Sequence, residues 1–232
     1  MTVRLTRTHW VAITAVVLAL LFAGAATVAS AGGDRRTTAA GAPGGDSADA
    51  GFARDMAVHH QQAVEMSFIV RDRTEDADVR RLAYDIANTQ ANQRGMLLGW
   101  LDLWGLPKVG SGIGPMAWMK SVKPSEHAGH DGHTGEGDQA GHETGDGSLM
   151  PGMATQAELD RLATAKGRQA EILYLQLMTD HHKGGVAMAQ GCAGLCTVAP
   201  EKSLAQGMVD AQQSELNLMA DMLKERGAAP RS

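Results

Sequence analysis

The sequence predicts an all-α protein, a four-helix bundle over residues 51–228 that is built from two similar helical hairpins. Apolar residues recur at helical spacing over 52–71 and 79–104, without the alternation typical of half-buried strands. The pattern Met-x-x-His-His at 56–60 returns at 178–182, an offset of 122 residues that aligns about 50 residues without a gap. Two amphipathic hairpins can bury their apolar faces against each other, which gives four packed helices.

The composition excludes several classes of protein. The 232 residues include 21 Lys and Arg against 26 Asp and Glu, a net charge of −5, and no basic stripe that would bind a nucleic acid. Two cysteines are too few for a disulfide scaffold. Thirteen Met is an unusual number beside three Phe, four Trp and two Tyr. Thioethers fill cores well, and they also bind copper.

Residues 1–31 have the organisation of a secretory signal peptide. Two arginines lie among the first nine residues, and an uncharged stretch over 10–31 ends in Ala-Ser-Ala. We expect cleavage after Ala31; the alternative is an uncleaved anchor, because a stretch of this length can span a bilayer. Either way we expect a secreted or extracytoplasmic protein that touches the membrane only through this segment. Residues 32–50, rich in Gly, Ala, Ser and Asp, are predicted to be a flexible linker.

Hairpin one is expected over 51–106. Its first helix carries the first His pair. Thr74, which two acidic residues follow, suits the start of its second helix. Gly105 and Pro107 suit the end of that helix, because glycine terminates helices well and proline cannot continue them.

Hairpin two is expected over 154–228. Thr155 and Glu158 have the spacing of a capping box, which would open one long helix that carries the second His pair. Pro200 fits the first turn of the next helix, where its missing N–H is not needed. Gly227 fits the end of that helix.

The hairpins are joined by residues 107–153, which are rich in Gly, His and Asp. We expect a disordered loop, because loops of this length are normally functional or disordered. Its histidines could collect metal loosely, but for tight binding we favour a solvated linker. These are His127, His130, His133 and His142. The loop is long enough to cross the bundle, which would relate the hairpins by a two-fold axis and bring both His pairs to one level.

The two His pairs and their flanking methionines form a candidate metal site. Residues three, four and seven apart share a helix face, so at least one His of each pair can point inward beside a thioether. Met favours Cu(I), whereas His accepts Cu(I), Cu(II) or zinc. The alternative is that the Met residues are core filler and the His residues are hydrogen-bonded, but burying two His pairs is costly unless something satisfies them. Matching polar residues of the second helices could hydrogen-bond to the imidazoles: Gln90, Gln93, Gln212 and Glu215.

Cys192 and Cys196 lie one helical turn apart and have no counterpart in hairpin one. A disulfide is the first expectation for an exported protein. An i,i+4 pair on a regular helix is awkwardly spaced for that bond, so the helix would have to fray. A second position for a soft metal ion is the alternative, and the sequence leaves both open.

The runs FARDMAVHHQQAVEMS and YLQLMTDHHKGGVAMAQ resemble the secreted bacterial domain-of-unknown-function family number three hundred and five. The resemblance covers about 52–106 and 170–228 and implies a ferritin-like four-helix bundle. Because this family includes CopM-type periplasmic copper-binding proteins, it also implies copper handling by His and Met ligands. The ligands that it implies are Met56, His59, His60, Met66, Met178, His181, His182 and Met188.

We therefore predict an exported protein that binds copper, as Cu(I) or Cu(II), for sequestration or homeostasis, with zinc as the alternative ion. Two other functions remain open: a metal-dependent oxidoreductase such as a cuprous oxidase, and a metal-free helical interaction module. A di-iron oxidase is disfavoured, because Asp55, Glu65 and Asp180 have no acidic counterpart at the offset of 122. The expected partner is the metal ion, and a homodimer is left open. Since only neutral imidazole binds a metal, Cu(II) affinity is expected to fall below about pH 6.

Overall fold

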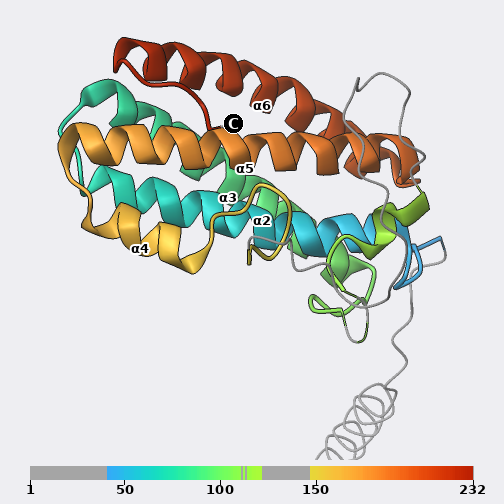
Figure 1. Ribbon diagram of the computed structural model, residues 1–232. Coiled ribbons are helices and arrows are strands. Elements are labelled where there is room, and N and C mark those ends of the chain that lie inside the picture. Colours follow the sequence, from blue (N-terminus) through green and yellow to red (C-terminus); the bar gives the residue numbers. More distant parts are fainter. Residues whose placement is uncertain (1–40, 111, 113, 122–146, 232) are drawn as a thin grey trace, which may run out of the picture. The chain divides into compact units, whose positions relative to one another are not determined.

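The computed structural model is all-helical in the part that it describes (Figure 1). It describes residues 41–110, 112, 114–121 and 147–231. The predicted signal or anchor segment lies outside these residues, as do residues 32–40 of the predicted linker and the four loop histidines. Among the helices that the structure describes, none combines the length and the apolar character needed to cross a membrane.

Four long helices form the two predicted hairpins. Helix α2 (Ala48–Arg71) pairs with α3 (Ala77–Leu103), and α5 (Gly167–Leu195) pairs with α6 (Ala199–Glu225). The hairpins meet through α2 and α5, which lie side by side at the centre (Figure 1). The start of α2 shares a core cluster with the end of α5, and the end of α2 shares another with the start of α5, so the two helices run antiparallel. The predicted four-helix bundle is confirmed.

The helix ends follow from local chemistry. Ser47 caps α2 by accepting a backbone N–H of the first turn at 3.1 Å, so this helix begins inside the predicted linker 32–50. Asp76 caps α3 in the same way. Gly105 and Gly227 follow α3 and α6 with φ of 67° and 61°, the left-handed conformation that favours glycine.

Hairpin two contains a helix that the sequence analysis missed. The capping box of Thr155 and Glu158 forms, but it opens the short helix α4 (Gln156–Thr164) rather than one long helix. The chain leaves helical geometry at Ala165, and Gly167 begins α5 with a left-handed φ of 51°. Glycine adopts this conformation readily, so the expected continuous helix breaks there.

Both ends of the segment 107–153, expected to be a disordered loop, pack on the bundle. Near its start, the 3-10 helix η1 (Ala117–Ser121) lies against α2. The Asp55 carboxylate there accepts a hydrogen bond from the Trp118 indole N–H at 2.9 Å. Near its end, Met150 is almost fully buried. We expected disorder because the middle of this segment is rich in Gly and His. Burial of large apolar side chains orders its two ends instead.

The covering segment, residues 147–155, passes over the middle of α5 at close range. A Cβ on Gly184 would lie 2.0 Å from the Pro151 carbonyl oxygen, so a larger residue does not fit there. Gln62 of α2 holds the same segment through two hydrogen bonds with the Ala154 backbone, at 2.8 and 2.7 Å. The covering segment is therefore fastened to both central helices.

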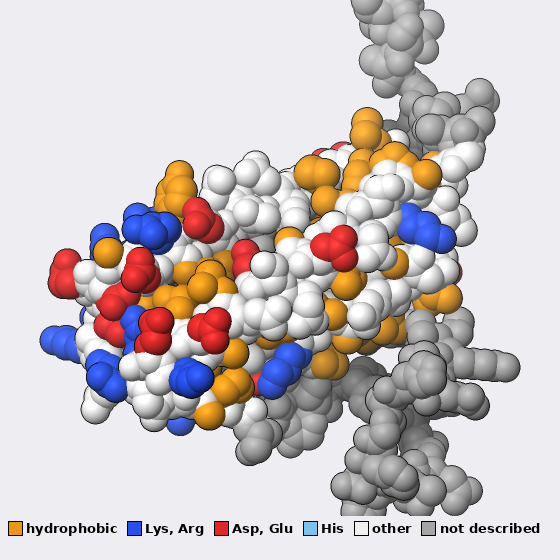
Figure 2. Space-filling view, turned by 90° about the horizontal axis from the view of Figure 1, so that it is seen from above, with side chains coloured by type: hydrophobic (Ala, Val, Ile, Leu, Met, Phe, Trp, Pro, Cys, Tyr) orange, Lys and Arg blue, Asp and Glu red, His pale blue; other side chains and the backbone are white. Residues whose placement is uncertain are grey.

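Charged side chains gather at the end of the bundle where α2 joins α3 (Figure 2). Arg226, just after α6, pairs with Asp76 at 2.9 Å and with Glu171 at 2.8 Å. The Thr74 hydroxyl donates to Glu171 at 2.6 Å. This network joins the turn of hairpin one to both long helices of hairpin two.

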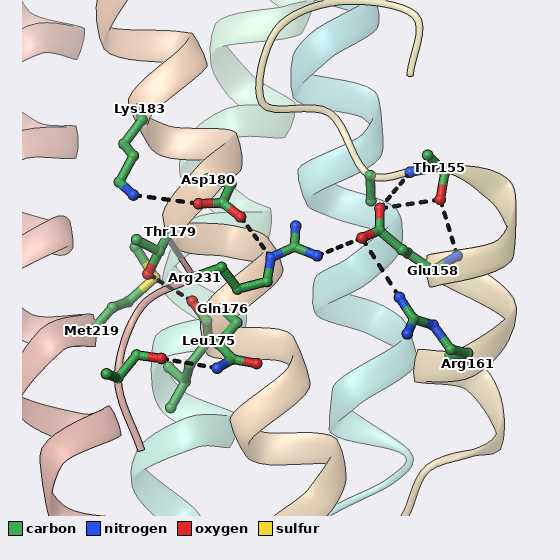
Figure 3. Close-up of polar contacts among 12 residues, drawn as sticks. Thr155, Glu158, Arg161, Leu175, Gln176, Thr179, Asp180, Lys183, Met219 and Arg231 are labelled. Atoms are coloured by element: carbon green, nitrogen blue, oxygen red, sulfur yellow. Dashed lines mark hydrogen bonds and ion pairs between the residues drawn. The ribbon is translucent and has the colours of Figure 1, made fainter. Parts of the chain in front are cut away.

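Arg231, in the C-terminal tail, links α4 to α5 (Figure 3). Its guanidinium pairs with Glu158 of α4, and its Nε donates to Asp180 of α5 at 2.7 Å. Partly exposed ion pairs contribute about 0–1 kcal/mol each. Their main effect here is to position α4, and the covering segment that leads into it, against α5.

Gly184→Ala should destabilise the protein by about 1–3 kcal/mol, because the new Cβ would overlap the Pro151 carbonyl. Gly207→Ala is the matched control, since a Cβ on this helical glycine of α6 would meet no neighbouring element of the described chain within 4 Å. It should stabilise the protein by up to about 1 kcal/mol. Urea unfolding measures the free energy of unfolding of both variants. Equal stability of the variants would contradict the close packing of the covering segment.

Candidate metal centre

All four predicted histidines are fully buried where α2 crosses α5. The rings of His59 and His181 lie against each other, with centroids 3.7 Å apart and an angle of 33° between their planes. The rings of His181 and His182 are 6.2 Å apart. The two His pairs therefore meet at one level of the bundle, as a two-fold relation between the hairpins predicts.

Hairpin two holds its two imidazoles in defined tautomers. His181 Nε2 donates to the His59 carbonyl oxygen at 2.9 Å, because a carbonyl can only accept. His182 Nε2 lies 2.6 Å from a carboxylate oxygen of Glu215 and likewise donates. In a neutral ring the other nitrogen, Nδ1, then carries a lone pair. Both Nδ1 atoms are buried without a hydrogen-bond partner among the described residues. An imidazole oriented by a carboxylate is the usual arrangement of a metal-binding His.

Hairpin one leaves its two imidazoles less constrained. Neither ring nitrogen of His59 or His60 has a hydrogen-bond partner in the described part of the chain. The amides of Gln93 and Gln90 interact with His60 outside hydrogen-bond geometry. Leaving a buried polar atom unpaired costs about 1–3 kcal/mol, so these rings are poorly satisfied by the protein itself.

Burial keeps the imidazoles of His59, His60 and His181 neutral. It lowers the pKa of His59 to about 3, and the electrostatic influence of the neighbouring His60 and His182 side chains adds to the shift. It also lowers the pKa of His60 to about 3 against the opposing effect of Gln93, and it lowers the pKa of His181 well below 6.5. The expectation that protons compete with the metal below about pH 6 is therefore wrong for His59 and His60. In the folded protein these two rings protonate only in strong acid.

The four predicted methionines are fully buried and lie on either side of the histidines along the bundle. Met56 and Met188 belong to the core cluster at the start of α2. Met66 and Met178 belong to the cluster at its end. Because α2 and α5 pack antiparallel, Met56 lies in the same cluster as Met188, and Met66 lies in the same cluster as Met178.

Met150 is not among the eight predicted ligands; in the sequence it belongs with the loop histidines to the tract that could collect metal loosely. It is 1% exposed and packs in the same cluster as Met56 and Met188. The neighbouring Pro151 backbone interacts with His59. The signal in the sequence was Leu-Met-Pro-Gly-Met at 149–153, an apolar group after a long polar stretch. The covering segment therefore adds a thioether beside the predicted site.

Acidic residues other than Glu215 have different roles. Asp55 accepts hydrogen bonds from η1 and the residue before it, and Asp180 pairs with Arg231, so neither orients an imidazole. Gly185 of α5 packs closely against α6, because a Cβ there would lie 2.4 Å from the Gln212 amide oxygen. Besides the His59 carbonyl of α2, the polar groups that interact with the four histidines therefore come from α3, α6 and the covering segment.

The metal-free protein should lose stability as the pH falls from about 6.5 toward 3. In that window unfolded His59 and His60 bind protons and the folded rings do not, which costs up to about 1.4 kcal/mol per pH unit for each residue. His60→Gln should remove one such contribution, so the free energy of unfolding should fall less steeply with decreasing pH. Urea unfolding of both proteins between about pH 7 and 5 measures this dependence. The same dependence in both proteins would contradict the burial of a neutral His60.

The family model described as "Domain of unknown function (DUF305)" matches residues 49–223. A search of curated proteins finds no match to this chain. The family match spans both hairpins and the whole of the candidate site.

Solved structures share the fold. A DUF305 protein from Streptomyces coelicolor, named as secreted, is 59% identical with a TM-score of 0.68, and the match covers 82% of this chain and 99% of that one. A DUF305 fragment from Deinococcus radiodurans is 26% identical with a TM-score of 0.57, covering 77% and 96%. CopM in its Cu(I)-bound form is 18% identical with a TM-score of 0.53, covering 76% and 96%. The chain belongs to the DUF305 family.

Proposed function

We propose that this protein binds copper at the buried His and Met cluster and sequesters it outside the cytoplasm. One observation carries the proposal: six imidazole nitrogens are buried without a partner among the described residues. Each such atom costs free energy until something binds it. A metal ion would satisfy several of them at once, whereas a metal-free packing module gains nothing from leaving them unpaired.

The donor set favours copper over zinc. Structural and catalytic zinc sites use Cys, His and carboxylate ligands, not thioethers. Here the four imidazoles are flanked by thioethers at both ends, and the neighbouring carboxylate of Glu215 already accepts a hydrogen bond from His182. Imidazole with thioether suits soft Cu(I), and imidazole also accepts Cu(II). The rings of His59, His60 and His181, which burial keeps neutral, can bind either ion without first losing a proton.

Burial favours retention of the ion over turnover. The histidines have no exposed surface, and the covering segment is fastened over the crossing of α2 and α5. A catalytic metal needs an open coordination position for its substrate. An enclosed cluster of this kind suits a protein that takes up an ion and holds it, so we favour sequestration over a cuprous oxidase.

Similar proteins support the same proposal. CopM, which shares the fold, has been solved in forms named as bound to Cu(I), Cu(II) and Ag. Silver and cuprous ions are both soft, which agrees with a thioether-rich site. The Streptomyces relative is named as a secreted protein. Together with the signal-like sequence of residues 1–31, this supports export of the present chain.

His59→Ala/His181→Ala should weaken copper binding by at least about 100-fold, because it removes the two imidazoles in contact at the crossing. Competition with chelators measures the affinity for Cu(I), Cu(II) and Zn²⁺. Deletion of residues 125–145 is the control, because it removes the four loop histidines and leaves both His pairs in place. Tight binding that survives the double substitution, or that disappears with the loop, would refute the proposed site.

Glu215→Gln should weaken copper binding by about 10–100-fold, because the carboxylate orients His182 and makes its ring a better donor. Asp210→Asn, an exposed change on the same helix, should leave the affinity unaltered. Circular dichroism checks that both variants keep their helices. Equal affinities in the two variants would show that the carboxylate does not support a ligand.

A further inference from the structure

A second cluster of ligand-type side chains lies where α5 turns into α6. Cys192 and Cys196 form a disulfide there, so of the two states that the sequence left open the structure has the oxidised one. Helix α5 ends at Leu195, and Cys196 has left helical geometry, which allows the bond. Cys192 Sγ, Cys196 Sγ and a carboxyl oxygen of Glu201 all lie within 4.8 Å of one another.

Glu201 is the unusual member of this cluster. It is fully buried in the first turn of α6, and neither carboxyl oxygen has a hydrogen-bond partner in the described ranges. Burial, followed by the negative charge of Asp49 and by an interaction between the two carboxyl groups outside hydrogen-bond geometry, raises the pKa of Glu201 to about 9. A buried acid held neutral beside two sulfur atoms is costly for the fold, so a ligand role would explain its position.

The turn between α5 and α6 is held independently of the disulfide. The Asp49 carboxylate, in the first turn of α2, accepts the backbone N–H groups of Thr197 and Val198 at 2.8 and 2.7 Å. It also accepts the Thr197 hydroxyl at 3.2 Å. Hydrogen bonds to a buried carboxylate are among the strong ones in proteins. The three ligand-type side chains should therefore stay together when the disulfide is reduced.

We propose that reduction of the Cys192–Cys196 disulfide creates a Cys₂Glu site for a thiophilic divalent cation, separate from the His cluster. Two thiolates and the Glu201 carboxylate supply three negative charges beside Asp49, and a divalent ion balances these better than a monovalent one. Cysteine sulfur and carboxylate oxygen are both regular ligands of Zn²⁺. The protein then has a second, redox-gated ion site that only its second hairpin provides.

The reductant is a dithiol. Thiol–disulfide exchange transfers two electrons and two protons from the dithiol to the protein, so the Cys192–Cys196 bond becomes two thiols and the reagent becomes a disulfide. The cation then displaces the protons of both thiols and of Glu201. Exchange with a disulfide reagent, which accepts two electrons and becomes a dithiol, re-forms the Cys192–Cys196 bond, removes two ligands and releases the ion.

The test is a Zn²⁺ titration of the full chain before and after treatment with dithiothreitol, which is removed under argon. The reduced protein should bind one equivalent of Zn²⁺ more than the oxidised protein. Glu201→Gln should weaken that extra equivalent by at least about tenfold. Gln resembles the neutral acid of the oxidised protein, so this variant should fold normally. Glu225→Gln, an exposed change on the same helix, is the matched control and should bind as the natural chain does.

Co²⁺ in place of Zn²⁺ should give a thiolate charge-transfer band in the reduced protein, and Cys192→Ser/Cys196→Ser should abolish it. No extra equivalent on reduction, or one that Glu201→Gln leaves unchanged, would overturn the proposal. So would loss of the helical circular dichroism on reduction, because the site depends on Asp49 holding the turn. The copper affinity of the His cluster is a separate readout, so failure here leaves the proposed function standing.

Discussion

Contact between the His59 and His181 rings at the crossing of α2 and α5 is the constraint on which the remaining structure depends. Polar rings at the centre of a bundle must be compensated, and most of the unusual local features are found around them. The His59 carbonyl and Glu215 each accept one imidazole N–H. The covering segment closes over the crossing, and Gly184 is required for its approach. These features are hard to explain by stability alone and easy to explain by an ion held at the crossing.

The two hairpins contribute unequally to this centre. Hairpin two fixes the tautomers of both its imidazoles, because the His59 carbonyl and Glu215 each accept one of their N–H groups. The residue of hairpin one equivalent to Glu215 is Gln93, which only approaches His60. Half of the proposed imidazole ligands are thus oriented in advance, and under this proposal the other half would adjust to an incoming ion. Such a division lowers the cost of binding while leaving room for ions that prefer different geometries.

Hairpin two also carries a disulfide at the end of α5, and hairpin one has no equivalent. Cys192 lies one turn beyond Met188, in the same core cluster, so the disulfide shares a packed environment with some of the proposed copper ligands. Asp49 holds the turn after Cys196 from the first turn of α2, which ties the disulfide corner to the helix that carries His59. Two ion sites of different softness and redox sensitivity would then be supported by the same pair of central helices.

Periodicity and repetition were enough to predict the four long helices, the pairing of the His residues at one level and the capping box at Thr155, because these depend on local spacing along the chain. Two features came only from contacts between distant residues: the burial of Met150 and the closeness of Glu201 to the cysteines. Packing also selected Glu215 from the four polar residues that the sequence offered as partners of the imidazoles. A residue's spacing sets which face of a helix it occupies. Which polar atoms lose water, and which neighbours then replace it, is decided when α2 packs against α5, because burial and pKa depend on every element around a side chain.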